Sequence, residues 1–180
     1  MAFYEKTLDS SVKYDGHILR VRYDTVELQN GGTAFREVVD HTGGVGIIGV
    51  TDEGTVPMVR QFRYPFMAET LEIPAGKLEK GEDPLACAVR ELSEETGYSA
   101  GRFVSLGTLL PSPGYCAETL YIYLALDLKR GNQHLDPDEF LNVEYYPLKK
   151  LHDMTMSGDL TDAKTVLAIL KAEIYLGELK

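Results

Sequence analysis

Three glutamates crowd one short segment of the chain, where Glu91, Glu94 and Glu95 follow Arg90. Residues three and four apart lie above one another on a helix, so these side chains would form one carboxylate patch. Like charges at this spacing destabilise a helix unless something compensates them. Mg²⁺ and Mn²⁺ are hard cations that bind carboxylate oxygens and leave positions open for phosphates. The spacing fits a divalent-metal site, and it fits a solvated helix face equally well.

The segment that carries the carboxylate patch is predicted to be a helix over residues 83–96. Asp83 is a favourable N-cap, Pro84 suits the first helical position, and Gly97 suits the left-handed residue that ends a helix. Apolar residues at helical spacing predict a stripe that packs on a sheet, with the glutamates on the adjoining arc. The residues of this stripe are Leu85, Ala88, Val89 and Leu92.

The rest of the chain is rich in predicted strands, so the fold class is α+β. The strands are expected at residues 17–28, 35–40, 45–50, 56–62, 103–109, 119–126 and 141–146, and further helices at 148–156 and 161–176. Turn residues at 30–32 predict a hairpin between the first two runs, and those at 52–54 predict one between the next two. We expect a single domain over residues 1–180, because no linker or repeat divides the chain.

Composition narrows the partners that the protein can have. The formal net charge is −10 and the sequence pI is about 4.8, so no general attraction draws the surface toward nucleic acid or anionic lipid. We therefore expect neither nucleic acid nor a membrane as partner. A phosphate substrate would need bound cations or a few arginines to offset the charge. Two cysteines and no signal-peptide pattern predict a cytoplasmic location.

The segment 76–98, GKLEKGEDPLACAVRELSEETGY, resembles the signature G-x5-E-x7-R-E-U-x-E-E-x-G-U of the Nudix hydrolase family, in which U is a bulky apolar residue. Only Tyr98 departs from it, being bulkier than the usual aliphatic residue. The resemblance implies an α/β/α sandwich around a mixed sheet, with an N-terminal extension of antiparallel strands. It also implies hydrolysis of a nucleoside diphosphate linked to another group. The matching residues are Gly76, Glu82, Arg90, Glu91, Leu92, Glu94, Glu95, Gly97 and Tyr98.

The same resemblance implies roles for individual residues. Arg90 would orient the carboxylates, with Glu82 as its partner, and Glu94 would be a further ligand or a water-mediated one. Two or three ions of Mg²⁺ or Mn²⁺ are expected. The implied metal ligands are the Ala75 carbonyl and the carboxylates of Glu91, Glu94 and Glu95.

Residues outside the signature resemble the ADP-ribose pyrophosphatases of this family. The segments 60–65 and 71–76 match, as do Ser112, Pro113 and Gly114 followed by Glu118. The resemblance implies hydrolysis of ADP-ribose to AMP and ribose 5-phosphate, with Glu118 near the terminal ribose or the metals. It places the adenine at a site that the strands of residues 1–42 build across a homodimer. The residues implied at that site are Ile18, Phe35 and Glu37, and a place in the core remains open for Phe35.

Two further residues complete the predicted site. Arg63 is expected to hold the pyrophosphate by a bidentate contact, and a surface salt bridge is the alternative for it. Glu139, in an acidic loop after the signature, is the candidate general base, with Asp138 as the alternative. Two other functions stay open: hydrolysis of a different substrate, such as GDP-mannose or a diadenosine polyphosphate, and a sensor that binds ADP-ribose without cleaving it.

Overall fold

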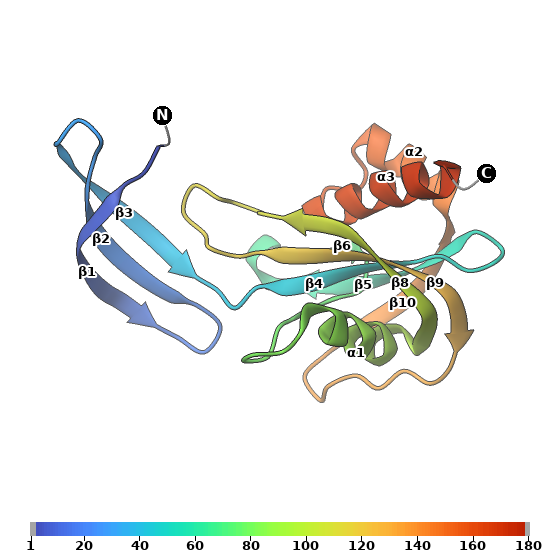
Figure 1. Ribbon diagram of the computed structural model, residues 1–180. Helices are drawn as coiled ribbons and strands as arrows, with labels where there is room; N and C mark the ends of the chain where they lie inside the picture. The colour runs from blue at the N-terminus through green and yellow to red at the C-terminus, as the bar shows by residue number, and fades with distance from the viewer. Residues whose placement is uncertain (1–2, 179–180) are drawn as a thin grey trace. The chain divides into compact units, whose positions relative to one another are not determined.

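Strand β4 (Gly44–Gly49) joins the two sides of the hydrophobic core. The computed structural model describes residues 3–178, and all six residues of β4 are buried in it. Successive side chains of a strand point to opposite faces. Val45 and Ile47 accordingly pack with α1 (Pro84–Thr96), whereas Ile48 packs in the cluster that includes α3 (Ala163–Glu178). Figure 1 shows α1 on one side of the strands and α2 (Leu148–Ser157) with α3 on the other.

The strands around β4 form two sheets. The mixed sheet has the order β7-β4-β9-β8, in which β4 and β9 are parallel and the other pairs antiparallel. The second sheet has the order β10-β5-β6 and is antiparallel. The mixed α+β fold with a mixed sheet between helices confirms the predicted class. The bounds are β5 (Thr55–Arg63), the 3₁₀ helix η1 (Tyr64–Phe66), β6 (Ala68–Glu72), β7 (Ala75–Lys77), β8 (Tyr98–Leu109), β9 (Leu120–Arg130) and β10 (Leu141–Pro147).

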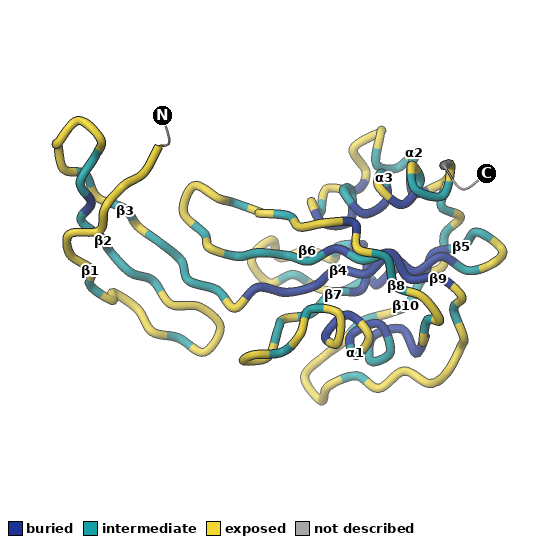
Figure 2. Tube along the Cα trace, in the orientation of Figure 1, coloured by how far each residue is buried: buried dark blue, intermediate teal, exposed yellow. Residues whose placement is uncertain are grey.

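The contacts within the chain divide it into two compact units, and the strands just described belong to one of them. The other unit holds the described residues up to Gly43 together with Leu110–Thr119. Its antiparallel sheet consists of β1 (Lys6–Asp15), β2 (Arg20–Glu27) and β3 (Thr33–Asp40), so the predicted hairpin at residues 30–32 is confirmed. Nearly every residue of the outer strand β1 is exposed (Figure 2).

The predicted hairpin at residues 52–54 is wrong in its pairing. The turn itself forms, because the Gly54 N–H donates to the Thr51 carbonyl at 2.9 Å. The strands on either side of it nevertheless belong to different sheets. Both edges of β4 are already hydrogen-bonded, to β7 and to β9, so none is left for β5. Among residues 3–178, no helix is long and apolar enough to cross a membrane.

Candidate active site

Helix α1 begins and ends where the sequence predicts. The Asp83 carboxylate accepts the N–H groups of Leu85 and Ala86 at 3.0 Å each. At the other end, Gly97 has a φ of 74°, and its N–H donates to the Ser93 carbonyl at 2.9 Å. A residue with a Cβ is strained in this left-handed conformation, so glycine ends the helix there.

The face that α1 buries differs from the predicted stripe. Leu85 and Val89 are 42% and 47% exposed, whereas Glu91 and Glu95 retain only 7% and 3% of their exposure. Apolar spacing alone placed the stripe wrongly at the two exposed positions. Glu91 and Glu95 are buried because this side of α1 packs against β7, where the Ala75 N–H donates a hydrogen bond to Glu95.

Strand β7 receives both buried carboxylates. Glu95 Oε2 accepts the Ala75 N–H at 2.9 Å. A Cβ added to Gly76 would lie 1.8 Å from Glu91 Oε1, which is far inside van der Waals contact. The first glycine of the signature is therefore required because the Glu91 carboxylate occupies the space of a side chain.

Arg90 lies between the carboxylates of its own helix and those of the preceding loop. Its Nη1 donates to Glu91 Oε1 at 2.7 Å and to Glu94 Oε2 at 3.0 Å. Its Nε and Nη2 both donate to Glu82, each at 3.0 Å. These bonds, with the N–H of Glu79, lower the pKa of Glu82 to about 2. The structure thus gives Arg90 the carboxylate partners that the sequence predicts.

The buried glutamates carry charge that the protein compensates only in part. Burial, followed by the charges of Glu91 and Glu139, raises the pKa of Glu95 to about 8, against the opposing bond from Ala75. Burial also raises the pKa of Glu91, although Arg90 opposes it. A divalent cation would remove this conflict, since its charge favours the ionised carboxylates.

The donor set suits Mg²⁺ or Mn²⁺ in its chemistry. The carboxylates of α1 and the Ala75 carbonyl on β7 offer only oxygen atoms, and these cations prefer oxygen to nitrogen or sulfur as a ligand. Within residues 3–178, no three acidic, histidine or cysteine side chains converge on one point. Two of the carboxylate oxygens that could bind a cation, Glu91 Oε1 and Glu94 Oε2, accept hydrogen bonds from Arg90 in this structure.

The loop after β9 is attached to the C-terminal end of α1. The Gly131 N–H donates to the Gly97 carbonyl at 2.7 Å, and the His134 N–H donates to that of Glu94 at 3.0 Å. Gln133 Nε2 donates to the Glu95 carbonyl at 2.6 Å. Helix C-termini leave carbonyls without partners, and this loop supplies donors for them. The sequence analysis did not identify Gln133.

Both candidate bases lie in this loop and are exposed. The charge of Glu139 acts on Glu91 and Glu95, since it contributes to raising the pKa of each. The structure therefore brings Glu139 toward the buried pair, and its role as base stays a prediction.

Arg63 at the end of β5 has a protein partner that the sequence analysis missed. Its Nε and Nη2 donate to the two oxygens of Glu72 at 2.7 and 2.6 Å. Lys164 also donates to Glu72, and Thr70 Oγ1 does so at 2.6 Å. Burial raises the pKa of Glu72, but the bonds from Arg63 and Lys164 outweigh it and hold this pKa at about 2.

The sequence indicates that Glu72 needs a charged partner, but it does not indicate that Lys164 is one of its partners. Glu72 stands between Leu71 and Ile73 in an apolar run, where a charge needs a partner. Lys164 lies 92 residues away from Glu72 along the chain, and no local pattern connects the two.

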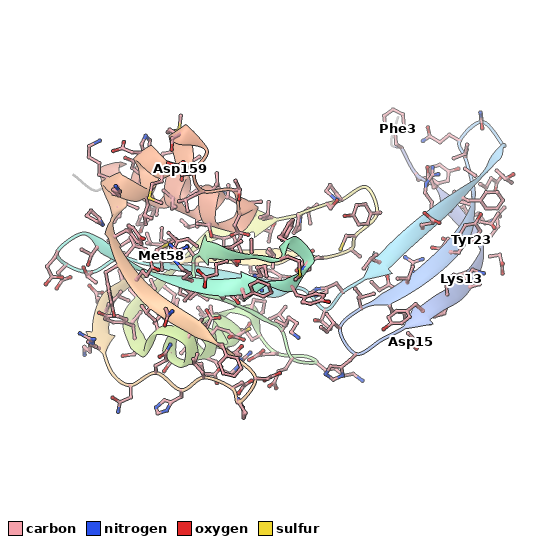
Figure 3. The ribbon with its side chains drawn as sticks, turned by 180° about the vertical axis from the view of Figure 1, so that it is seen from behind. Phe3, Lys13, Asp15, Tyr23, Met58 and Asp159 are labelled. Carbon is pink, nitrogen blue, oxygen red and sulfur yellow. The ribbon has the colours of Figure 1, made fainter. Side chains whose placement is uncertain are left out.

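The predicted adenine-site residues belong to the unit that holds β1–β3. Phe35 is 61% exposed and stacks on Tyr23 with 5.2 Å between ring centroids, so the alternative of a core phenylalanine is wrong. Glu37 is two residues further along β3 on the same exposed face, and Ile18, in the turn before β2, is 55% exposed. Lys13 Nζ lies 5.5 Å from the Tyr23 ring, and Figure 3 shows these two residues close together.

The segment of Ser112, Pro113 and Gly114 belongs to the same unit. The Cys116 N–H closes a turn on the Ser112 carbonyl at 3.0 Å. The residues that follow pair with the end of β3, where the Ala117 N–H donates to the Val39 carbonyl at 2.9 Å. Glu118 Oε1 lies 3.6 Å from His41 Nδ1. The predicted residues at 18, 35, 37, 112–114 and 118 therefore belong to one unit, and Arg63, Ala75, Glu91, Glu94, Glu95 and Glu139 belong to the other.

Comparison with known proteins shows which family the chain resembles. Residues 40–167 match the NUDIX domain, and residues 5–39 match the nucleoside diphosphate sugar hydrolase N-terminal domain. The ADP-ribose pyrophosphatase of Bacillus subtilis (strain 168) is 41% identical over 167 residues, which make up 92% of this chain and 90% of that protein. The methanol dehydrogenase activator of Bacillus methanolicus is 40% identical over 169 residues, 93% of this chain and 91% of that one.

A solved structure shows the same fold. The crystal structure of an ADP compounds hydrolase aligns with a TM-score of 0.86 over 99% of this chain and 98% of that chain, at 22% identity. Nudix hydrolases are generally dependent on divalent metal ions, in keeping with the oxygen donors on α1 and β7. The signature residues occupy these two elements, and the NUDIX domain match covers most of the sequence. The chain belongs to the Nudix family of hydrolases.

Proposed function

We propose that this protein hydrolyses the pyrophosphate bond of ADP-ribose, giving AMP and ribose 5-phosphate. The observation that carries the chemistry is the pair of buried carboxylates, Glu91 and Glu95, held against Ala75 and Gly76. The B. subtilis relative supports the substrate, since its name is ADP-ribose pyrophosphatase. The B. methanolicus relative is equally similar and has a different name, so identity alone does not select the substrate.

Two or three ions of Mg²⁺ or Mn²⁺ are the cofactor that we propose. The Ala75 carbonyl, Glu91 and Glu95 would hold them, with Glu94 as a further ligand. When bound, such ions neutralise phosphate charge and lower the pKa of a water molecule. Arg90 orients the carboxylates through its bonds to Glu91 and Glu94.

Arg63 and Glu139 act on the substrate and on the water. Arg63 Nη1 has no hydrogen-bond partner among residues 3–178, and the side chain is 39% exposed, so it is available to a phosphate oxygen. Glu139 takes the proton of the attacking water, because it is an exposed carboxylate whose charge reaches the buried pair. Asp138, one residue earlier, remains the alternative base.

The unit with β1–β3 supplies adenine and ribose recognition in this proposal. Phe35 would offer an exposed aromatic ring to the base, and the exposed Ile18 and Glu37 would contact the base as well. Glu118 would lie near the terminal ribose or the metals, and the turn at residues 112–114 would bring backbone N–H groups close to a ribose or a phosphate. A substrate such as GDP-mannose or a diadenosine polyphosphate would keep the carboxylate chemistry and alter only these contacts.

We also propose that the protein is a cytoplasmic homodimer formed through β1. Among residues 3–178 this strand pairs with β2 alone, so its other edge offers a row of backbone groups, and it exposes Leu8 and Val12 by 49% and 43%. Multi-angle light scattering should give about twice the chain mass of 20.0 kDa. The variant L8K/V12K should shift the protein toward the monomer, and a monomeric wild type would contradict the proposal.

The two cysteines are free, as in a reducing compartment.

Product analysis tests the substrate assignment. The purified protein would be incubated with Mg²⁺ and, separately, ADP-ribose, ADP-glucose, GDP-mannose, NADH and diadenosine tetraphosphate, and the products separated by chromatography. We expect AMP and ribose 5-phosphate from ADP-ribose, at a higher rate than any other cleavage. Preferred cleavage of another compound would overturn the substrate assignment, whereas binding of ADP-ribose without cleavage would indicate a sensor.

A further inference from the structure

Among residues 3–178, the buried carboxylate of Glu72 accepts more hydrogen bonds than any other buried carboxylate. It is 2% exposed, and four donor atoms reach its two oxygens. Oε1 accepts from Arg63 Nε at 2.7 Å and from Thr70 Oγ1 at 2.6 Å. Oε2 accepts from Arg63 Nη2 at 2.6 Å and from Lys164 Nζ. A buried ion pair of this kind is often replaceable by apolar residues without loss of stability, so stability alone is a weak reason for it.

Lys164 connects this carboxylate to the first turn of α3. The side chain is only 10% exposed, and Nζ also lies 3.0 Å from Asp162 Oδ2. Asp162 in turn accepts the N–H and hydroxyl of Thr165, at 3.0 and 2.6 Å. The Thr165 hydroxyl accepts the Ile73 N–H at 2.9 Å. The end of β6 is therefore fixed to α3 at two consecutive residues.

This attachment determines where the Arg63 guanidinium can be. Two parallel bonds to one carboxylate fix the plane of the guanidinium as well as its position. The remaining nitrogen, Nη1, is then the part of Arg63 that can meet a ligand. Glu72 stands three residues before Ala75, whose N–H donates to Glu95 at 2.9 Å, and the charge of Glu95 is among those that raise the pKa of Arg63, after the bond with Glu72.

We propose that Glu72 and Lys164 are positioning residues, which hold Arg63 so that Nη1 faces the phosphates of the substrate. Glu72 clamps the guanidinium directly. Lys164 acts one step further back, because its bonds to Glu72 and Asp162 keep the carboxylate in place. The inference rests on the proposed function, in which Arg63 contacts the pyrophosphate.

A double-mutant cycle between Lys164 and Arg63 tests this role. K164M removes the charge and keeps the volume, and K164R restores a cation at the same place. K171M is the matched control, since Lys171 lies on the same helix and donates to the Leu106 carbonyl instead of to Glu72. The measurements are KM and kcat for ADP-ribose with Mg²⁺, the Kd of ADP in EDTA by calorimetry, and Tm for folding.

We expect K164M to raise KM for ADP-ribose and Kd for ADP by about tenfold each, with a much smaller change in kcat. K164R should recover most of the loss, and K171M should leave both values unchanged. In an R63M background, K164M should have no further effect on either value. Equal effects of K164M with and without Arg63 would overturn the proposal, as would unchanged values in a folded K164M.

Should K164M fail to fold, E72Q provides the same test, because the amide keeps the shape of the side chain and loses its charge. E72Q should raise KM and Kd in the wild-type background and leave them unchanged in R63M, and additive effects would overturn the inference. Failure of the proposed function would be visible separately, as a wild type that does not cleave ADP-ribose. The ADP calorimetry still measures the coupling in that case.

Discussion

Replacing Glu95 by glutamine should stabilise the protein in the absence of divalent ions. The pKa of Glu95 is raised from 4.5 to about 8 in the folded chain, chiefly by burial. At about 1.36 kcal/mol per pKa unit, ionisation of the buried Glu95 carboxyl lowers the unfolding free energy by about 5 kcal/mol above pH 8 and by about 3 kcal/mol at pH 7. A raised carboxylate pKa gives stability that is complete below pH 4.5 and is lost as the pH rises through 8. Glutamine can still accept the Ala75 N–H, so E95Q loses the charge alone.

The assay is urea unfolding of wild type and E95Q in EDTA, followed by circular dichroism at several pH values between 4 and 9. The difference in unfolding free energy should be near zero at pH 4, grow with pH, and level off above pH 8. E94Q is the matched control on the same helix, since Glu94 is 38% exposed and buries far less charge. A difference between wild type and E95Q that does not change with pH would refute the reasoning.

Three other substitutions follow from particular contacts. G76A should abolish hydrolysis and lower Tm, because the added Cβ would lie 1.8 Å from Glu91 Oε1; an active, fully stable G76A would contradict this. E72Q should lower the unfolding free energy by about 3 kcal/mol, because folding lowers the pKa of Glu72 from 4.5 to about 2. Urea titrations should show the full loss above pH 4.5 and none once the pH has fallen through 2. Q133A should lower kcat more than KM, because Gln133 attaches the loop of Glu139 to α1; equal kcat in stopped assays would argue against it.

The ends of α1 were predictable because their causes are local. Asp83 and Gly97 act on backbone groups within four residues, so the sequence alone locates them. The buried face of the same helix was not predictable from periodicity. Its orientation depends on β7, where the Ala75 N–H binds a carboxylate that apolar spacing places on the arc adjoining the buried stripe.

The sheet pairing and the Glu72 network depend on residues that are distant in sequence. The turn at residues 52–54 is local and forms, but the parallel partner of β4 is β9, more than seventy residues later. Lys164 reaches Glu72 across 92 residues in the same way. Signature residues could be found because the family pattern fixes their spacing, whereas the residues that position Arg63 have no such pattern.

The account depends most on the claim that the buried pair of glutamates binds the divalent ion required for hydrolysis. Its most direct test is to measure Mn²⁺ binding by electron paramagnetic resonance and AMP release from ADP-ribose on the same samples of wild type and E95Q. We predict that wild type binds Mn²⁺ and releases AMP, and that folded E95Q loses most of both. E95Q that releases AMP at the wild-type rate would contradict the account.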